Sequence, residues 1–286
     1  MSADLTWLPA WSIRNLIADR EVSPVEVVEH FLGRIEDNNK TLNAFQAIDA
    51  TRAREQATRA EEAVVEGRDL GPLHGVPISV KEYIPVAGLL HRDSNGVMTG
   101  PSMHDALSVE RLRQAGAIVV GTNTAMGITE ALLNPYNREL EARNPWDTGR
   151  VTGWSSSGGG AAAAAALVPI ALGNDGGGST RLPAAGCGVV GVHPTPGLVP
   201  EVNYAEPKLP ALTTSSGPIC RSVVDAAIAL QAMAGPDGRD FAGTKTEPTN
   251  YLAHIHDGVE GFRFVWTDDF GFARMYAQEN LSLIHI

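Results

Sequence analysis

Residues 153–181 read GWSSSGGGAAAAAALVPIALGNDGGGSTR, and this stretch decides the fold that we expect. Its alanine run, 160–166, is small and apolar throughout, which predicts a buried helix. The run 167–172 that follows is short and apolar, as in a core strand. A serine among glycines stands at each end, in 153–160 and in 175–181. The stretch thus predicts a helix and a strand that join two serine loops.

These two loops have a composition that suits nucleophilic catalysis. Glycine lets backbone N–H groups approach a ligand closely. A serine beside such exposed N–H groups can attack a carbonyl, and the N–H groups stabilise the oxyanion that forms. Two flexible loops are the alternative interpretation, because serine and glycine are also common in loops without a function.

Periodic segments surround the central stretch. A capping box, Ser23-Pro24-Val25-Glu26, opens a helix whose apolar residues recur at helical spacing. Apolar alternation over 75–81 predicts a short strand that ends at Lys81. Further predicted elements are helices over 51–66, 108–115 (capped at Ser108) and 222–234 (capped at Ser222), and a strand over 117–120. This pattern predicts an α/β fold, a mixed twisted sheet covered by helices.

We expect a single domain over 1–286, because no internal repeat and no long linker interrupts the chain. Within it we expect an N-terminal helical part, 1–70, and a catalytic core, 71–235. Residues 262–266 predict a late strand with no helix after it to cover it. That pattern predicts a fold whose C-terminal part is missing.

The composition is that of an ordinary globular protein, since 43% of the 286 residues are hydrophobic and 19% are charged. The formal net charge of −11 argues against a nucleic-acid-binding surface. No basic stretch leads into an apolar run at the start, and the longest apolar run, 158–172, is too short to span a bilayer. Two cysteines, Cys187 and Cys220, are too few for a disulfide scaffold. We therefore expect a cytoplasmic protein with reduced, buried thiols and no membrane partner.

Several familiar motifs can be set aside. Neither serine loop has the G-x-S-x-G spacing of a nucleophile elbow, and no H-E-x-x-H or C-x-x-C motif offers zinc ligands, so we expect no metal. His254 and His256 have weak spacing for a metal and are better interpreted as solvated loop residues. Residues 186–191 match G-x-G-x-x-G, but Pro194 and Pro196 prevent the helix that a dinucleotide loop must open.

A nucleophilic serine needs a base, and only one histidine, His193, lies near either loop in the sequence. A neutral lysine can serve as the base instead. An unperturbed lysine is neutral only about 0.04% of the time at pH 7, but burial lowers a lysine pKa by roughly 3–5 units. Lys81 is the candidate because it ends an apolar strand, and an exposed lysine at a strand end is the alternative.

Three parts of the sequence together resemble the amidase signature family. Residues 75–82, GVPISVKE, are similar to the family's lysine strand, and 153–183 are similar to its serine- and glycine-rich signature. Residues 143–147 and 188–191 also resemble family segments. The resemblance covers nearly the whole chain, up to about Arg274, and members of the family are longer.

The resemblance implies a Ser–Ser–Lys triad for amide hydrolysis that needs no metal or cofactor. Lys81 corresponds to the base and Ser179 to the nucleophile. Ser155 corresponds to the bridging serine, held by a cis peptide bond, although from the residues alone Ser156 and Ser157 compete with it. The oxyanion hole corresponds to the backbone N–H groups of Gly176, Gly177, Gly178 and Ser179.

Asp175 and Arg181 flank the candidate nucleophile. We expect them to support the loop through hydrogen bonds and an ion pair rather than to bind substrate, because polar residues beside a catalytic group usually brace it. Departures from the family pattern occur at Trp154, Thr180 and His193 and over 89–100 and 122–137. The last two regions would line the substrate pocket, so the identity of the amide stays open.

We therefore predict an enzyme, an amidase that hydrolyses the C–N bond of a small-molecule carboxylic amide. One alternative within the family is the glutaminase component of a tRNA-dependent amidotransferase (its A subunit), which releases ammonia from glutamine and works with tRNA-binding partners. A non-catalytic binding protein with a decayed site is the alternative from another class, against which the intact Lys81, Ser155 and Ser179 argue. Assembly into a homo-oligomer is left open.

Overall fold

The computed structural model describes residues 4–92, 97–125, 141–201, 213–265, 267 and 271. The chain divides into two units, Met1–Ala253 and His254–Ile286. The predicted helical part, 1–70, and the predicted catalytic core, 71–235, both lie within the first unit. The single domain over 1–286 stays a prediction.

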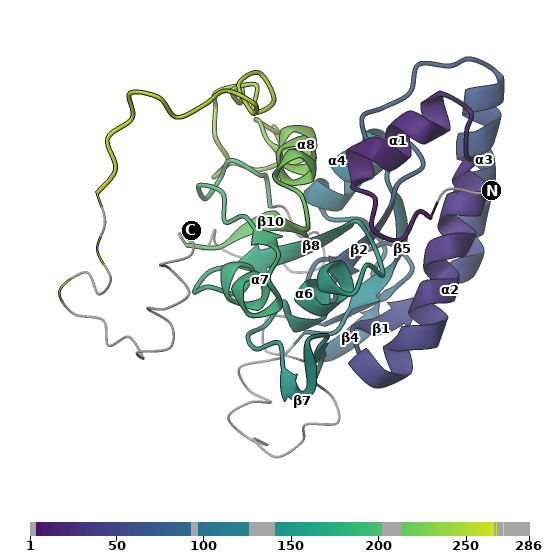
Figure 1. Ribbon diagram of the computed structural model, residues 1–286, viewed down its shortest axis with the longest axis horizontal. Coiled ribbons are helices and arrows are strands. Elements are labelled where there is room, and N and C mark those ends of the chain that lie inside the picture. Colours follow the sequence, from purple (N-terminus) through teal and green to yellow (C-terminus); the bar gives the residue numbers. More distant parts are fainter. Residues whose placement is uncertain are drawn as a thin grey trace. The chain divides into compact units, whose positions relative to one another are not determined.

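A mixed sheet lies at the centre of the first unit, with six strands among the described residues. In their order across the sheet the strands are β1 (Phe45–Ile48), β5 (Ile118–Asn123), β2 (Pro77–Lys81), β8 (Ile170–Asp175), β10 (Ser215–Cys220) and β9 (Val190–Gly191). β5, β2 and β8 are parallel, whereas β1, β10 and β9 are antiparallel to their neighbours. The predicted mixed α/β sheet is confirmed (Figure 1).

Helices pack against this sheet and against one another. Among the described residues the helices are, in chain order, α1 (Ala10–Ala18), α2 (Pro24–Leu42), α3 (Ala50–Val65), α4 (Leu107–Gln114), α6 (Ser157–Ala164), α7 (Arg181–Cys187) and α8 (Val223–Met233). α6 contacts β8, β10, β2 and β5, α8 contacts β10 and β8, and α2 lies along α3 (Figure 1). The described residues of the first unit also form two small antiparallel pairs, β3 (Leu90–Arg92) with β4 (Met98–Pro101) and β6 (Arg143–Asn144) with β7 (Asp147–Val151).

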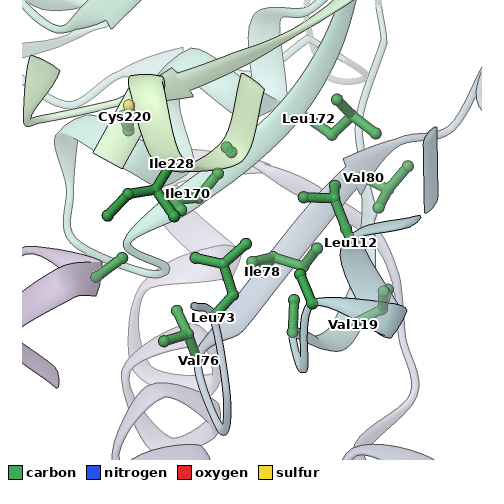
Figure 2. Packing of buried hydrophobic residues seen from close by; sticks show 14 of the residues in the cluster. Leu73, Val76, Ile78, Val80, Leu112, Val119, Ile170, Leu172, Cys220 and Ile228 are labelled. Atoms are coloured by element: carbon green, nitrogen blue, oxygen red, sulfur yellow. The ribbon is translucent and has the colours of Figure 1, made fainter. Parts of the chain in front are cut away.

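Alternate residues of β8 belong to two different hydrophobic clusters, because side chains of a strand point to opposite faces of the sheet. Ile170 and Leu172 pack in the first cluster, where Leu112 of α4 and Ile228 of α8 meet the strands (Figure 2). Ala171 packs in the second cluster, with the alanines of α6. Helices thus cover both faces, and every residue of the neighbouring strand β2 is buried.

Two predicted helix caps are confirmed. Ser23 Oγ accepts a hydrogen bond from the N–H of Glu26, and the Glu26 carboxylate accepts one from the N–H of Ser23. Ser222 caps α8 by accepting a hydrogen bond from the N–H of Asp225. Both motifs act within one turn of chain, so the sequence alone specifies them.

The predicted cap at Ser108 is wrong. α4 begins at Leu107 and its N-cap is Ala106, so Ser108 lies inside the helix, where its side chain is buried. The strand predicted from residue 167 begins only at Ile170, since the proline before it has no N–H to donate to a sheet.

Two further predictions need correction. Residues 262–265, in the second unit, form no strand, and the side chains of Phe262 and Phe264 are exposed instead of packing on a sheet. The part predicted as helical contains β1, which pairs with β5.

Among the described residues, no helix combines the length and the apolar character that crossing a bilayer requires.

Candidate active site

Lys81 is the last residue of β2, between β5 and β8 in the middle of the sheet. Its side chain is only 1% exposed, although a lysine in a protein is rarely buried without a partner. The strand is buried on both faces, and this burial carries Lys81 into the interior. The exposed strand-end lysine that was the alternative is therefore wrong.

Among the described residues, three oxygen atoms lie around the Lys81 amine. Nζ lies 2.7 Å from Ser155 Oγ, 2.6 Å from Asn174 Oδ1 and 3.4 Å from the main-chain oxygen of Asn174. The ring of Tyr83 faces the same amine, with its centroid 4.9 Å from Nζ. The amine is thus fixed by residues from β2, β8 and the first serine loop.

Burial lowers the pKa of Lys81 to about 7, because the charged form loses its hydration. The carboxylates of Asp175 and Glu82 act in the opposite direction, since negative charge nearby favours the ammonium. A large fraction of Lys81 is therefore neutral near pH 7, as a general base must be.

The three consecutive serines of the first loop have different partners. Ser155 lies next to the Lys81 amine, whereas Ser156 Oγ donates to the main-chain oxygen of Asn174 at 3.2 Å. Ser157 Oγ donates to the main-chain oxygen of Thr124 at 3.4 Å. Of the three, only Ser155 is placed to exchange a proton with Lys81.

The backbone before Ser155 turns sharply. Gly153 and Trp154 both have left-handed conformations, with φ of 77° and 57°. The cis peptide bond expected at Ser155 is not found, because all peptide bonds of the described residues are trans. The two left-handed residues directly precede Ser155, whose hydroxyl contacts Lys81.

Ser179 lies in the second serine loop, between β8 and α7, and its side chain is half-buried. Its main-chain oxygen accepts a hydrogen bond of 3.2 Å from the N–H of Ser156, which joins the two serine loops. Among the described residues, the hydroxyl of Ser179 has no hydrogen-bond partner, so Ser179 and Ser155 are not hydrogen-bonded through their side chains in this structure. The structure brings Lys81 and Ser155 into contact and places Ser179 on the adjoining loop.

Asp175 holds the backbone of the second serine loop through hydrogen bonds to its carboxylate. It is fully buried, and its carboxylate accepts hydrogen bonds from the N–H groups of Gly178, Thr180 and Arg181 at 2.6–3.2 Å. Arg181 adds an ion pair to the same carboxylate. Although burial raises the pKa of Asp175, the hydrogen bonds from Arg181 and these N–H groups lower it well below its ordinary value.

The predicted oxyanion hole includes one N–H group that already has a hydrogen-bond partner. The N–H of Gly178 already donates to Asp175, so it is not available to an oxyanion in this conformation. Gly176 and Gly177 are exposed at the loop surface, and no hydrogen bond of their N–H groups is found among the described residues. These two N–H groups remain candidates for the oxyanion hole, together with that of Ser179.

Comparison with known proteins identifies the family. A sequence model of the amidase family matches residues 26–263. The chain belongs to the amidase family. It is 36% identical to the acylamidase of Rhodococcus erythropolis over 94% of this chain and 56% of that protein. It is 38% identical to the A subunit of the glutamyl-tRNA(Gln) amidotransferase of Anaeromyxobacter sp. (strain K) over 86% of this chain and 50% of that protein.

The fold agrees with that of a solved amidase. A bacterial aryl acylamidase of the amidase signature family superposes with a TM-score of 0.76 and 28% identity, covering 86% of this chain and 51% of that one. The chain thus spans about half the length of the relatives that it matches.

The residues that depart from the family pattern have definite places in this amidase fold. Trp154 is half-exposed, and Thr180 is buried as the N-cap residue of α7. His193 Nε2 lies 3.0 Å from the main-chain oxygen of Thr213. Of the two regions expected to line the substrate pocket, 93–96 and 126–137 lie outside the described residues.

The G-x-G-x-x-G match and the two cysteines have structural places in the fold. Residues 186–191 close a helix rather than open one, since α7 ends at Cys187 and Gly188 follows with φ of 68°. Cys187 and Cys220 are free and buried, and burial raises both thiol pKa values to about 12. Within the part of the chain that the structure describes, no group of three or more metal-binding side chains is found.

Sequence reasoning missed three neighbours of the lysine. Asn174 contacts it directly, Tyr83 faces it, and Glu82 forms a buried ion pair with Arg92, at 3.2 Å between Nε and Oε2. One signal was available for Asn174, since a polar residue directly before Asp175 ends an otherwise apolar strand.

Proposed function

We propose that this chain carries the catalytic centre of an amidase that hydrolyses a small-molecule carboxylic amide. Lys81 is the base, Ser155 the proton relay and Ser179 the nucleophile. The observation that carries the proposal is the 2.7 Å contact between Ser155 and a buried lysine whose pKa is about 7. A lysine of this kind is rare outside catalytic sites.

The reaction follows from the chemistry of these groups. Neutral Lys81 takes the proton of Ser155, Ser155 takes the proton of Ser179, and Ser179 Oγ attacks the amide carbonyl carbon. For this step the Ser179 side chain must turn towards Ser155. Collapse of the tetrahedral intermediate breaks the C–N bond, and the relay returns the proton to the leaving nitrogen. Water then hydrolyses the acyl-enzyme by the same relay in reverse, without metal or cofactor.

Backbone N–H groups at the second loop stabilise the oxyanion of the tetrahedral intermediate. Gly176, Gly177 and Ser179 are the proposed donors, and Gly178 joins them only if its bond to Asp175 is exchanged. Loss of one such donor typically costs about 100–1,000-fold in rate. Asp175 and Arg181 hold the loop in shape and take no part in proton transfer.

A fluorophosphonate probe, which phosphonylates activated serines, tests the proposal on this chain. We expect an adduct on Ser179, located by peptide mass spectrometry, and its loss in both Ser179→Ala and Lys81→Ala. Lys40→Ala is the matched control, because Lys40 is exposed at the end of α2, and it should label like the wild type. Labelling of a different serine, or unchanged labelling in Lys81→Ala, contradicts the proposal.

The similarity to the A subunit of an amidotransferase supports a second candidate within the same chemistry. In that case the amide is glutamine, and ammonia is released only when partner subunits are present. Ammonia release from glutamine with and without added amidotransferase partner subunits separates the two candidates. A decayed binding protein gives neither hydrolysis nor a probe adduct. Cytoplasmic location and homo-oligomer formation stay predictions.

A further inference from the structure

Asn174 presents two hydrogen-bond acceptors to one amine. It lies 93 residues after Lys81 in sequence and is the penultimate residue of β8. Its side-chain oxygen is 2.6 Å from Lys81 Nζ and its main-chain oxygen 3.4 Å. The same main-chain oxygen also accepts from Ser156 Oγ, so the strand end is anchored to the first serine loop.

The inventory of donors and acceptors around the amine decides its orientation. A neutral lysine amine has two N–H bonds and one lone pair, whereas the two Asn174 oxygens can only accept hydrogen bonds. Of the three oxygens around Nζ, only the Ser155 hydroxyl has a hydrogen that it can donate. With both N–H bonds directed at Asn174, the lone pair must face Ser155.

We propose that Asn174 is a positioning residue of the proton relay, which aims the lone pair of neutral Lys81 at the Ser155 hydroxyl. This inference rests on the proposed function, because an aimed lone pair matters only if Lys81 is a base. After proton transfer, all three N–H bonds of the ammonium have acceptors, namely Ser155 and the two oxygens of Asn174. Asn174 therefore also favours the charged form that the reaction creates.

The charged groups around Lys81 set the background against which the expected pKa shifts are measured. Asp175 on β8 and Glu82 after β2 favour the ammonium, and each is itself paired, with Arg181 and Arg92. The ring of Tyr83 presents its face to the amine. These groups are present in every variant below, so a change at Asn174 acts on top of a constant background.

We expect two substitutions at position 174 to shift the pKa of Lys81 in opposite directions. Asn174→Leu keeps the size of the side chain but removes its acceptor, so the pKa of Lys81 should fall by about one unit. Asn174→Asp keeps an acceptor and adds a negative charge, so the pKa should rise by about one unit or more. The chain has four lysines, so ¹³Cε-labelled lysine gives few NMR signals, and Lys81→Ala assigns the one of interest.

The rate of fluorophosphonate labelling gives the second readout. On its alkaline plateau, Asn174→Leu should label about 10–100-fold more slowly than the wild type, because the base is no longer aimed. Asn174→Asp should recover most of that loss, with the midpoint of its pH profile moved upwards. Asn39→Leu is the matched control: Asn39 makes two hydrogen bonds with the backbone of Phe45 and none with Lys81. Asn39→Leu should lower the stability of the chain and leave the pKa of Lys81 and the labelling rate unchanged.

The outcomes separate this inference from the proposed function. If Asn174→Leu keeps the wild-type lysine pKa and labelling rate, or if both variants shift the pKa in the same direction, Asn174 does not position the amine. If Asn174→Leu gives no folded spectrum, the direction of the shift in Asn174→Asp decides. A wild-type chain without any serine adduct contradicts the proposed function instead, while the NMR titration still measures the effect of Asn174 on Lys81.

Discussion

The Asp175 carboxylate and the Arg181 guanidinium form a two-point ion pair, with Arg181 Nε 2.9 Å from Oδ2 and Nη2 3.0 Å from Oδ1. The two partners are unequally exposed, since the Asp175 side chain is fully buried while that of Arg181 is 52% exposed. Without the Arg181 side chain, the backbone N–H groups of Gly178, Thr180 and residue 181 still satisfy the carboxylate. Without Asp175, those three donors lose their acceptor inside the protein.

We therefore expect Asp175→Ala to destabilise the chain far more than Arg181→Ala. Loss of the buried anion should lower the free energy of unfolding by about 3–5 kcal/mol, because several charge-assisted hydrogen bonds disappear together. Loss of the half-exposed cation should cost about 1 kcal/mol or less. Urea unfolding at pH 7.5 measures both values. Equal losses in the two variants would show that the ion pair, and not the backbone contacts, holds the loop.

The three serines of the first loop provide a test with built-in controls. We expect Ser155→Ala to slow probe labelling of Ser179 by about 100–10,000-fold, because the proton has no route to Lys81. Ser156→Ala and Ser157→Ala should change it by less than about tenfold, since their hydroxyls donate to main-chain oxygens. The rate is followed by intact-mass spectrometry. A larger effect at Ser156 than at Ser155 would mean that the relay runs through Ser156 instead.

The buried lysine predicts how stability depends on pH. The pKa of Lys81 is about 7 in the folded chain, and that of an unfolded lysine is about 10.4. Between these values the unfolded state binds more protons, so stability rises with pH, and below pH 7 the full cost of burying the charge is present. From pH 7 to pH 9 this group alone should add about 2 kcal/mol to the free energy of unfolding.

Lys81→Met removes the titrating group and keeps the apolar stem. We expect its unfolding free energy to rise less steeply from pH 7 to pH 9 than that of the wild type, by the amount just given. Lys40→Met, at an exposed lysine, should retain the wild-type slope. Urea unfolding at several pH values provides the comparison. Identical slopes for the wild type and Lys81→Met would mean that Lys81 is not neutralised by burial.

How much the sequence can predict depends on how local each feature is. The helix caps at Ser23 and Ser222 act within four residues, so their residues suffice to predict them. The burial of Lys81 follows from an apolar strand and is nearly as local. Ser108 shows where local prediction fails. Its residue type suits an N-cap, but α4 begins at Leu107, so Ser108 is buried inside the helix.

Contacts between distant segments could not be predicted in this way. The Lys81–Asn174 contact exists because β2 and β8 are neighbours in the sheet, an order that no local pattern specifies. Ser155, and not its two neighbours, contacts Lys81, and it follows a left-handed backbone at Trp154, a residue type that rarely adopts this conformation. The engagement of the Gly178 N–H by Asp175 likewise requires the folded loop.

The glycines that open α6 give a last test, since two neighbours in one helix differ in their surroundings. A Cβ at Gly158 would lie 2.7 Å from the backbone N of Thr124 and even closer to the main-chain oxygen of Ala44, and neither backbone atom can move easily. The atoms nearest to a Cβ at Gly159 would all belong to side chains, those of Ile219 and Ala171 at 3.3 and 3.4 Å and that of Asn123 at 3.8 Å. The first position is closed to a side chain, whereas the second can adapt.

Alanine at either position improves helix propensity by about 1 kcal/mol, so propensity alone predicts the same gain for both variants. We expect Gly158→Ala to lower the free energy of unfolding by about 1–3 kcal/mol, because overpacking outweighs the propensity gain. Gly159→Ala should change it by less than about 1 kcal/mol. Since Gly158 follows the serine loop directly, Gly158→Ala should also slow labelling of Ser179, while Gly159→Ala labels at the wild-type rate. A stabilised Gly158→Ala would mean that α6 does not pack against Ala44 and Thr124, and that something else holds Ser155 beside Lys81.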